Sequence, residues 1–364
     1  MTQQNNYCII MAGGIGSRFW PVSRREKPKQ FLDILQTGRT LLQQTYDRFI
    51  QICPAENIFV VTNQIYEGLV AEQLPELSDT QILGEPMRRN TAPCVAYANM
   101  KIRRRNPEAR IVVAPSDHLI LQEEKFIKTI SEGLAFVSKS KNLMTLGITP
   151  SRPETGYGYI QLSEHANLNR TIIPVKSFTE KPDRKTAEMF IETGEFLWNS
   201  GIFIWTLESI DKAFQRFLPD IAGLFADEEA EIFKNPNQEK SIIQKIYSEC
   251  RNISIDKGIM EYADCVSVLR ADFGWSDLGT WDSLHTNLPH NEDGNALNSQ
   301  QIICSNVKNS IIHISKDTLL VAEDLDGYII AESNKVILIC KKENESKIRT
   351  FVNEAEMKGG EKYL

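Results

Sequence analysis

Residues 9–21 read Ile-Ile-Met-Ala-Gly-Gly-Ile-Gly-Ser-Arg-Phe-Trp-Pro, and residues 27–32 read Lys-Pro-Lys-Gln-Phe-Leu. The apolar run is typical of a strand, and it ends at three glycines. Glycine backbone can turn its N–H groups toward an anion, and it has no side chain to block the approach. Arg18 can bind two phosphate oxygens at once, and Lys29 supplies a point charge. The stretch predicts a nucleoside triphosphate held at the first strand of an α/β sheet.

Two better-known glycine motifs do not fit this stretch. A dinucleotide-binding fingerprint needs Gly-x-Gly-x-x-Gly, and Phe19 stands at its last position. A P-loop needs Gly-Lys followed by Ser or Thr, and the chain has no such triplet. An NAD-dependent dehydrogenase is therefore disfavoured. A tight turn without a ligand would explain the glycines alone, but Arg18, Pro21 and the Lys-Pro-Lys segment favour phosphate binding.

Composition limits the class of protein. The 364 residues suit one large domain and a smaller one, and 41 Lys and Arg against 48 Asp and Glu give a net charge of −7. This balance offers no general attraction for nucleic acid or an anionic membrane. The seven cysteines contain no Cys-x-x-Cys pair, and no apolar run is long enough to span a bilayer. We expect a soluble, cytoplasmic protein with reduced thiols.

The first half of the chain alternates short apolar strands with helical stretches. This alternation predicts a mainly parallel sheet covered by helices on both faces. Ligands of such sheets bind beyond the carboxyl ends of the strands, where the glycine loop and residues 116–118 are both expected. The predicted strands are 7–11, 58–62, 81–83, 111–114 and 143–147, and the predicted helices are 40–51, 66–74, 92–105 and 123–139. The basic run Arg103-Arg104-Arg105 is interpreted as a solvated helix end.

The second half of the chain has a different pattern of predicted strands and helices. Residues 157–162 and 172–179 are expected to be antiparallel strands, followed by helices over 184–192, 207–217 and 238–249. Beyond about residue 290 the chain becomes β-rich, with strands predicted at 310–314, 318–322, 328–332 and 335–340. Their short spacing makes a β-helix-like solenoid one option for this region. Exposed strands there would suit a homodimer contact.

Further segments combine charged side chains with turn residues. They are residues 84–93 (Gly-Glu-Pro-Met-Arg-Arg-Asn-Thr-Ala-Pro), 115–118 (Pro-Ser-Asp-His), 179–182 (Thr-Glu-Lys-Pro), 255–261 (Ile-Asp-Lys-Gly-Ile-Met-Glu) and 273–281 (Phe-Gly-Trp-Ser-Asp-Leu-Gly-Thr-Trp). Each has a plain structural interpretation. Asn90 or Thr91, Asp256, and Ser276 or Asp277 can each cap a helix, and Asp117 can form a turn.

With the opening pattern, these segments resemble the signature of the sugar-1-phosphate nucleotidyltransferases, and residues 84–93 resemble the base-binding region of the mannose-1-phosphate guanylyltransferases. The resemblance covers about residues 7 to 290. It implies a Rossmann-like nucleotidyltransferase domain over residues 1–290, with a mixed, mainly parallel sheet, and a small β-rich domain over residues 291–364. It also implies transfer of GMP from GTP to α-D-mannose 1-phosphate, giving GDP-mannose and pyrophosphate. Because the chain ends at Leu364, we expect a monofunctional enzyme.

The resemblance also assigns the nucleotide site. Arg18 and Lys29 would hold the pyrophosphate, and Asp117 and Asp277 would bind Mg²⁺. Guanine presents two neighbouring donors, so its pocket needs acceptors, which Glu85 or backbone carbonyls near Pro86 can supply. This favours GTP over UTP or dTTP. The nucleotide-binding set is Ala12, Gly13, Gly14, Gly16, Glu85, Pro86, Asn90, Thr91 and Ser116.

The sugar phosphate is assigned to later segments by the same resemblance. Lys181 would anchor the phosphate and Glu180 a sugar hydroxyl. The sugar-phosphate-binding set is Gly158, Glu180, Lys181, Asn199 and Gly201. Together with Arg18, Lys29 and Asp117, Lys181 completes the predicted catalytic residues.

The expected chemistry is a single in-line displacement by the sugar phosphate, because no protein nucleophile is needed. Two alternatives stay open at this point. One is the same chemistry with UTP or dTTP and glucose 1-phosphate. The other is a non-catalytic sugar-nucleotide-binding regulatory subunit, which would be expected to lose charged site residues. Arg18, Lys29, Asp117, Lys181 and Asp277 are all present.

Overall fold

The computed structural model describes residues 3–14, 16–163 and 171–364, which fall into two compact units. The first unit comprises the residues up to 13, 45–116 and 120–275. The second comprises residues 14–44, 117–119 and 276–364, so the segment after the first strand groups with the C-terminal residues. The domain boundary at residues 290 and 291 stays a prediction. Within the described ranges, no helix is long and apolar enough to cross a membrane.

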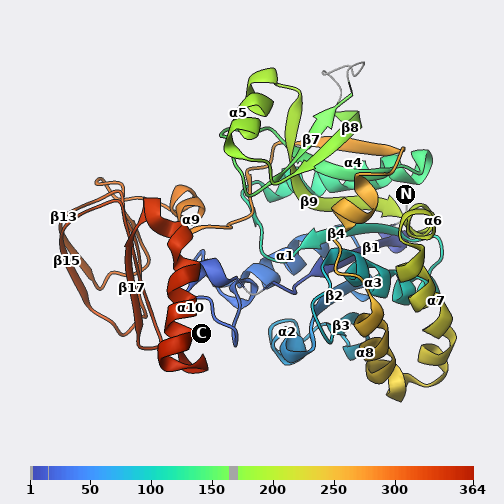
Figure 1. Ribbon diagram of the computed structural model, residues 1–364, viewed down its shortest axis with the longest axis horizontal. Coiled ribbons are helices and arrows are strands. Elements are labelled where there is room, and N and C mark those ends of the chain that lie inside the picture. Colours follow the sequence, from blue (N-terminus) through green and yellow to red (C-terminus); the bar gives the residue numbers. More distant parts are fainter. Residues whose placement is uncertain (1–2, 15, 164–170) are drawn as a thin grey trace. The chain divides into compact units, whose positions relative to one another are not determined.

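A mixed sheet organises the first unit (Figure 1). Its described strands run in the order β3-β2-β1-β4-β9-β6-β10-β8-β7. The bounds are β1 Asn6–Met11, β2 Ile58–Asn63, β3 Ile82–Glu85, β4 Arg110–Pro115, β6 Leu143–Ile148, β7 Gly158–Leu162, β8 Ile172–Glu180, β9 Phe196–Thr206 and β10 Val266–Ala271. Three short elements span residues of both units: α1 Leu41–Phe49, β5 Leu119–Ile120 and β11 Trp275–Ser276.

The predicted α/β class and mixed sheet are confirmed, but the sheet is not mainly parallel, because four of its described strand pairings are parallel and five are antiparallel. Strands β1 to β4 pair in parallel, whereas β9 is antiparallel to both β4 and β6. Strands β7 and β8 pair antiparallel, as predicted. In the parallel part Met11 lies opposite Val61 on β2 and Pro115 on β4. The carboxyl ends of β1, β2 and β4 therefore meet at one edge, as expected.

Helices cover both faces of this sheet. Phe203 and Trp205 of β9 join the core formed with α3, α6, α7 and α8, whereas Ile204 between them faces Gly133 of α4. Adjacent residues of a strand point to opposite faces, so α4 covers the second face. The helices are α2 Glu67–Gln73, α3 Thr91–Arg105, α4 Glu123–Ser140, α5 Arg184–Thr193, α6 Leu207–Phe217, α7 Pro219–Lys234 and α8 Glu239–Glu249. All were predicted except α7.

The second unit is built on stacked parallel strands. Ile302 of β13 lies opposite Leu320 of β15, and Ile311 of β14 opposite Ile329 of β16, so each ladder repeats after 18 residues. Such in-register stacking is typical of a β-solenoid. The elements are α9 Trp281–Asn287, β12 Ala296–Leu297, β13 Ile302–Lys308, β14 Ile311–His313, β15 Leu320–Asp326, β16 Tyr328–Ser333, β17 Val336–Lys341 and α10 Ile348–Gly359.

The C-terminal helix α10 packs on the segment that follows the first strand. Phe19 and Trp20 share one apolar core with Ile348 and Trp281. The Trp20 indole also donates a hydrogen bond of 2.6 Å to the carbonyl of Tyr363, just beyond α10. These contacts fix α10 beside the glycine loop within the second unit.

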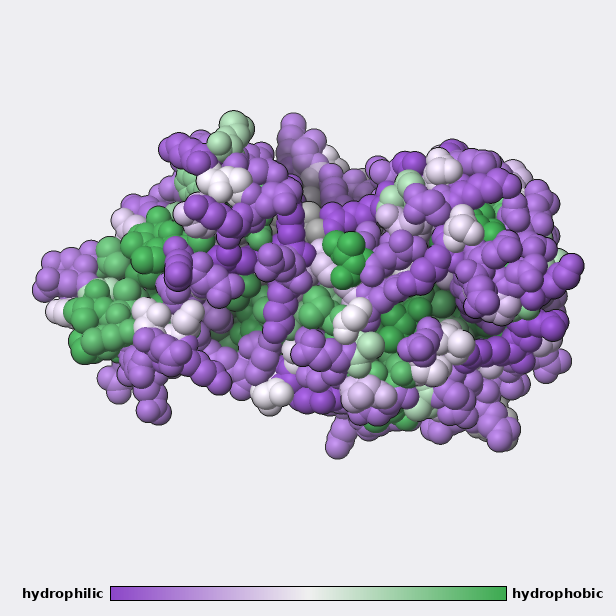
Figure 2. Space-filling view, turned by 90° about the horizontal axis from the view of Figure 1, so that it is seen from below, coloured by the Kyte–Doolittle hydropathy of each residue, from purple (hydrophilic) through white to green (hydrophobic). Residues whose placement is uncertain are grey.

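One face of the stacked strands is apolar and exposed. Ile303 and Val321 are opposite each other in the β13–β15 ladder and are 55% and 68% exposed. Leu319 adds to this C-terminal apolar surface, which we define as Ile303, Leu319 and Val321. Figure 2 shows apolar side chains exposed on the unit that carries these strands.

Candidate functional site

The glycine loop closes on the lysine segment within the second unit. Gly16 has φ +56°, and a Cβ there would lie 2.6 Å from the Cβ of Lys29 and 2.7 Å from the Ser23 hydroxyl. Only glycine fits this conformation and this space. The Gln30 side-chain amide donates a hydrogen bond of 2.8 Å to the carbonyl of Gly14. The glycines of the loop therefore allow its backbone to pack directly against Lys29.

A pocket of about 300 Å³ lies at this loop. Five predicted residues line it, although they come from distant parts of the sequence: Gly16, Arg18, Lys29, Asp117 and Asp277. Phe19, His118, Leu278, Gly279 and Arg349 complete its wall. The structure thus assembles the predicted phosphate and metal residues in one pocket of the second unit.

Lys29 is the buried cation of this pocket. It begins the 3-10 turn η3 (Lys29–Phe31) and is 3% exposed. Its Nζ lies 2.8 Å from Oδ2 of Asp117 and donates to the carbonyls of Asp277 at 2.8 Å and Leu278 at 3.0 Å. Burial alone would raise the pKa of Asp117, but the Lys29 ammonium and then His118 outweigh it, so this pKa is lowered. Asp117 is thereby kept ionised.

Asp277 is not a helix cap. Helix α9 is capped by Thr280, whose hydroxyl accepts a hydrogen bond of 3.0 Å from the backbone N–H of Ser283. Asp277 instead accepts a bond of 2.8 Å from the backbone N–H of Gly279. Arg18 donates to the carbonyl of Gly279 at 3.3 Å. The turn over residues 277–279 therefore carries the Asp277 carboxylate and one contact of Arg18 on the pocket wall.

Arg349 was not found from the sequence. It lies on α10, is exposed, and lines the same pocket. Among the described residues it has no hydrogen-bond or ion-pair partner. No motif marks it, because an arginine in a polar C-terminal helix looks like an ordinary surface residue. Its place in the pocket follows from the packing of α10 on Phe19 and Trp20.

The pocket meets the chemical requirements of Mg²⁺. Magnesium prefers one or two carboxylates and completes its shell with phosphate oxygens and water. Asp117 and Asp277 provide two carboxylates on one pocket wall. In the described ranges no group of three or more His, Cys, Asp or Glu side chains could form an all-protein metal cage. The donor set therefore fits a metal that arrives with a phosphate ligand.

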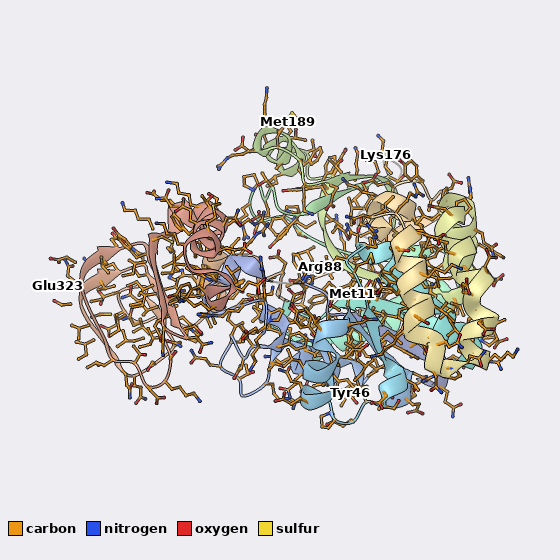
Figure 3. All side chains as sticks on the ribbon, turned by 60° about the horizontal axis from the view of Figure 1, so that its bottom comes forward. Met11, Tyr46, Arg88, Lys176, Met189 and Glu323 are labelled. Carbon is orange, nitrogen blue, oxygen red and sulfur yellow. The ribbon has the colours of Figure 1, made fainter. Side chains whose placement is uncertain are left out.

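The segment predicted to bind the base, residues 84–93, begins at the sheet edge of the first unit. Glu85 ends β3, is 8% exposed, and accepts a hydrogen bond of 3.0 Å from the Tyr247 hydroxyl. A Cβ on Gly13 would lie 3.4 Å from Oε2 of Glu85, so this carboxylate borders the backbone that follows β1. Burial raises the pKa of Glu85 to about 7, against the lowering effects of Tyr247 and Arg88. Figure 3 labels Arg88 and Met11 at this edge.

Asn90 and Thr91 hold the start of α3. Asn90 has φ +68°, and its side chain accepts from the backbone N–H of Thr91 at 3.0 Å, which confirms it as the N-cap. The Thr91 hydroxyl accepts from the backbone N–H of Ile255 at 2.9 Å. Ala12 and Ser116 are buried at the same edge, and the backbone N–H of Ser116 donates to Met11 at 3.0 Å. Direct contact of these residues and Pro86 with a nucleotide stays a prediction.

The predicted sugar-phosphate residues meet where β7, β8 and β9 adjoin. Gly158 lies opposite Glu180 in the β7–β8 ladder, and a Cβ on Gly158 would be 2.7 Å from Oε2 of Glu180. Lys181 follows with φ +48°, and its Nζ lies 2.8 Å from Oε1 of Glu180. The Lys181 side chain is 61% exposed. A carboxylate and an exposed cation are therefore available beside a glycine.

Asn199 connects this group to Asp256. Its side-chain oxygen accepts from the Thr145 hydroxyl at 2.9 Å and from the backbone N–H of Gly201 at 3.2 Å. Its nitrogen donates to Oδ1 of Asp256 at 2.7 Å. The expected capping role of Asp256 is wrong, because Asp256 begins one turn of π-helix and makes no capping bond. Burial, and next the nearby Glu180, raise the pKa of Asp256 to about 6.

Known proteins are similar to this chain in sequence. The sequence pattern of the nucleotidyl transferase family matches residues 7–294. The chain is 32% identical over 360 residues to a mannose-1-phosphate guanylyltransferase of Escherichia coli, covering 96% of this chain and 76% of that protein. It is 33% identical to the alginate biosynthesis protein AlgA of Pseudomonas putida, covering 96% and 72%.

A solved structure is similar over nearly the whole chain. The structure described as mannose-1-phosphate geranyltransferase from Thermus thermophilus matches with a TM-score of 0.83 at 26% identity. The match covers 97% of this chain and 100% of that one. The similarity therefore includes the stacked C-terminal strands as well as the sheet.

Proposed function

Because the chain belongs to the nucleotidyl transferase family, we propose that it transfers GMP from GTP to α-D-mannose 1-phosphate. The products are GDP-mannose and pyrophosphate. The curated relatives that carry the name mannose-1-phosphate guanylyltransferase, with 32 to 35% identity over most of the chain, support this choice of substrates.

The pocket in the second unit is the observation that carries the proposal. It joins Arg18 and Lys29 to two carboxylates, Asp117 and Asp277. Cations beside carboxylates suit a magnesium-bound polyphosphate better than a free anion, because the carboxylates would repel the latter. Asp117 and Asp277 would hold the Mg²⁺, which when bound would neutralise phosphate charge.

The reaction needs positioning and charge neutralisation. A phosphate oxygen of the sugar phosphate attacks the α-phosphorus of GTP, and the bond from that phosphorus to the bridging oxygen of pyrophosphate breaks. Arg18, Lys29 and Arg349 would hold the leaving pyrophosphate. The Gly14 and Gly16 segment lets these charges approach without a side-chain obstacle.

Lys181 serves the attacking substrate. Its ammonium would bind the sugar phosphate and reduce repulsion between the two anionic substrates. Glu180, Asn199 and Asp256 form a set of donors and acceptors suited to sugar hydroxyls. Gly158 keeps space beside this set, because a Cβ there would lie 2.7 Å from Oε2 of Glu180.

Glu85 supports guanine as the base. The carboxylate can accept both the N1–H and the 2-amino donors of guanine, whereas the Watson–Crick edges of uracil and thymine offer one donor between two acceptors. UTP or dTTP with glucose 1-phosphate is the second candidate. It would be favoured if Glu85 did not accept hydrogen bonds from the base. A non-catalytic regulatory subunit is disfavoured, because the residues proposed to bind phosphate and metal are all present.

The chain is further proposed to act in the cytoplasm as a homodimer. All seven cysteines are unpaired, which suits a reducing compartment. The C-terminal apolar surface offers a contact for a second copy, because exposed apolar strands favour association.

Substitution of the metal ligands tests the phosphate side. Asp277→Ala should abolish release of pyrophosphate from GTP and mannose 1-phosphate, because the remaining carboxylate cannot fix the metal–nucleotide geometry. Asp282→Ala, on the exposed face of α9, is the matched control and should keep wild-type turnover. Wild-type turnover and magnesium dependence in Asp277→Ala would show that the metal assignment is wrong.

A further inference from the structure

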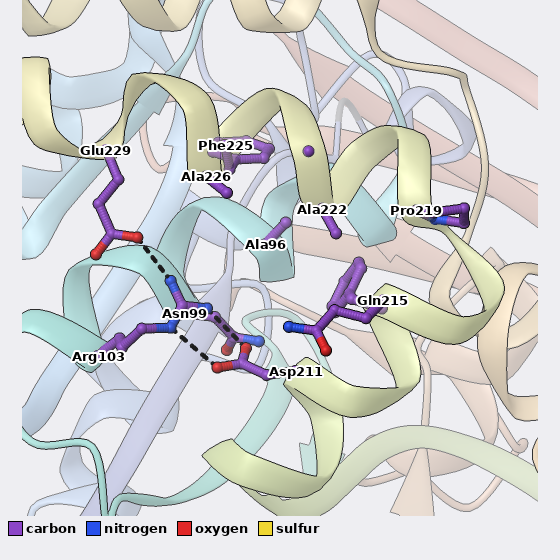
Figure 4. Close-up of a pocket in the computed structure, with 12 residues that line it drawn as sticks. Ala96, Asn99, Arg103, Asp211, Gln215, Pro219, Ala222, Phe225, Ala226 and Glu229 are labelled. Carbon is purple, nitrogen blue, oxygen red and sulfur yellow. Dashed lines mark hydrogen bonds and ion pairs between the residues drawn. The ribbon is translucent and has the colours of Figure 1, made fainter.

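Three helices of the first unit, α3, α6 and α7, are held together by one arginine (Figure 4). Arg103 of α3 donates to both carboxylate oxygens of Asp211 on α6, at 3.0 and 2.8 Å, and to Glu229 on α7 at 3.0 Å. The interpretation of Arg103 as a solvated helix end is therefore wrong. Phe225 of α7, labelled in the same figure, stacks on Tyr97 of α3 with ring centroids 6.2 Å apart. Ion pairs and ring packing together fix α7 on α3.

Tyr247 of α8 completes this aromatic group. Its ring centroid lies 6.5 Å from that of Tyr97 and 6.3 Å from that of Phe225, and both pairs are edge to face. The side chain is 0% exposed. Arg89 donates from Nε to the backbone carbonyl of Tyr247 at 2.9 Å. The ring of Tyr247 is therefore fixed by its neighbours, and its backbone is tied to the segment predicted to bind the base.

The hydroxyls of Tyr97 and Tyr247 have different carboxylate partners. Tyr97 donates to Oε1 of Glu239 at 2.6 Å, and Lys101 donates to the other oxygen of Glu239 at 2.6 Å. Tyr247 donates to Oε1 of Glu85 at 3.0 Å. The first bond connects two helices, whereas the second reaches a residue proposed to bind a substrate.

Oε2 of Glu85 is the oxygen that a ligand can reach. It has no hydrogen-bond partner among the described residues, and it is not one of the fully buried polar atoms that lack a partner, so it keeps accessible surface. A Cβ on Gly13 would lie 3.4 Å from Oε2, so this oxygen faces the backbone that follows β1. Because Tyr247 holds Oε1, it determines which oxygen of Glu85 is presented.

We propose that Tyr247 is a positioning residue for base selection, which holds Glu85 so that Oε2 is presented to the base as an acceptor. This role rests on the proposed function, because it requires contact between Glu85 and guanine. Guanine has a donor at N1, whereas adenine has an acceptor there. A protonated carboxyl group is a donor as well as an acceptor, so a proton on Oε2 would suit adenine. Tyr247 thereby favours GTP over ATP.

Charged and titratable groups face Glu85 from α8, from α3 and from the loop after β3. Burial, the largest effect, raises the pKa of Glu85 to about 7, and the Tyr247 hydroxyl and Arg88 lower it. Cys94 and Tyr97 of α3 also interact with this carboxylate, and burial is the main cause that raises their own pKa values. Loss of the Tyr247 hydroxyl should therefore raise the pKa of Glu85 further, so that more of the group is protonated at pH 7.

Tyr247→Phe removes the hydroxyl and keeps the ring. The KM for GTP at pH 7 should rise at least about fivefold, and the preference for GTP over ATP in kcat/KM should fall by a similar factor. The kcat and the KM for mannose 1-phosphate should stay within about twofold of wild type. By pH 9 the difference in the KM for GTP should shrink to about twofold, because Glu85 is then ionised in both proteins.

Tyr97→Phe is the matched control. It removes the equivalent hydroxyl from the same aromatic group and breaks the bond to Glu239. The KM for GTP and the preference for GTP over ATP should both stay within about twofold of wild type. A similar change in Tyr97→Phe and Tyr247→Phe would mean that both hydroxyls only stabilise the helices, and would overturn the proposal.

A double-mutant cycle tests whether Tyr247 acts through Glu85. In the Glu85→Gln background, Tyr247→Phe should raise the KM for GTP less than about twofold further, because the group that it positions has changed. Additive effects, or an active wild type whose KM for GTP is unaffected by Tyr247→Phe, would overturn the positioning role alone. Calorimetry with GTP separates this role from the proposed function. GTP binding that Tyr247→Phe weakens, in a protein without turnover, would support the positioning role and contradict the reaction.

Discussion

Glu85 and Asp256 are carboxyl groups whose burial raises the pKa to about 7 and about 6. Each lies among residues that the proposal assigns to a substrate: Glu85 to the base and Asp256 to the sugar. Perturbed carboxyl groups of this kind are concentrated at functional sites. A ligand that donates hydrogen bonds to either group would favour its ionised form and so lower the pKa again.

The raised pKa of Glu85 predicts a pH dependence of GTP binding. Below pH 7 the group is mostly protonated, and a neutral acid cannot accept both guanine donors. As the pH rises from 6 to 8 the ionised fraction grows about tenfold, so the KM for GTP should fall by a similar factor. Steady-state kinetics across this range measures the effect.

Glu85→Gln is the control for this pH effect. The variant should raise the KM for GTP at pH 8 about tenfold or more, because a charged acceptor is lost. It should also remove the extra pH dependence, while the titration of the GTP phosphates stays common to both proteins. The same pH slope in both proteins would show that Glu85 does not bind the base.

Lys181 is predicted to act on the second substrate alone. Lys181→Ala should raise the KM for mannose 1-phosphate at least about tenfold, since a charge-assisted bond to phosphate is lost. The KM for GTP should change less than about twofold. Lys185→Ala, an exposed lysine on α5, should change neither constant. If Lys181→Ala raised the KM for GTP and not the KM for mannose 1-phosphate, the assignment of Lys181 to the sugar phosphate would be wrong.

Residues within motifs could be predicted from the sequence, and residues outside them could not. Asp117 and Asp277 were expected together, and the structure places both on one pocket wall. The hydrogen bond from Asn199 to Asp256 spans 57 residues, and nothing in either local sequence signals it. Arg349 depends on how α10 packs, which only the assembled core determines.

At the scale of elements, α10 connects the C-terminal strands to the pocket that Arg18, Lys29, Asp117 and Asp277 line. It shares its core with Phe19 and Trp20 and pairs with the loop segment through Arg25 and Glu356, 2.9 Å apart. The helix thereby presents Arg349 to the pocket without any contribution from the sheet of the first unit. The C-terminal region thereby contributes a residue to the pocket proposed to bind phosphate.

Arg349→Ala tests this role of α10. The KM for GTP, and the KM for pyrophosphate in the reverse reaction, should each rise about fivefold at low salt, which corresponds to the ~1 kcal/mol of an exposed charge. The KM for mannose 1-phosphate should not change. Lys358→Ala, near the end of the same helix, is the matched control and should behave as wild type. Loss restricted to the sugar phosphate would contradict the assignment.

Most helices and strands could be predicted because the spacing of apolar residues that marks each of them is visible in the local sequence. Helix α7 was missed because it begins at Pro219, one residue after α6 ends. A proline directly after a helix is also typical of a loop, so the sequence did not signal a second helix there. Strand β13 was missed because its exposed and half-buried residues interrupt the apolar run. The 18-residue repeat of the stacked strands rests on backbone pairing, and its sequence shows little identity from coil to coil.

At the scale of the whole molecule, the glycine loop is the first of several points where the chain passes from one unit to the other. Gly13 belongs to the first unit and Gly14 to the second. The residues proposed to bind the base and the sugar phosphate lie in the first unit, and those proposed to bind pyrophosphate and metal lie in the second. The sequence predicts most members of both groups, Arg349 and Asp256 excepted, but not this division, which depends on contacts between distant segments.

The C-terminal apolar surface predicts self-association. Val321→Lys should convert a dimer into a monomer in sedimentation velocity at micromolar concentration, because a charge would be buried in the contact. Ile337→Lys, an exposed apolar position on β17 outside the defined surface, should leave the dimer intact. A wild-type monomer, or a Val321→Lys dimer, would contradict the proposed contact.

This chain is proposed to join the GMP of GTP to mannose 1-phosphate. The most direct measurement is pyrophosphate release with magnesium, across GTP, UTP, dTTP and ATP, each paired with mannose 1-phosphate and with glucose 1-phosphate. GTP with mannose 1-phosphate should give a kcat/KM at least about a hundredfold above any pair that contains a pyrimidine nucleotide. Preference for a pyrimidine nucleotide, or no pyrophosphate from any pair while GDP-mannose still binds, would contradict it.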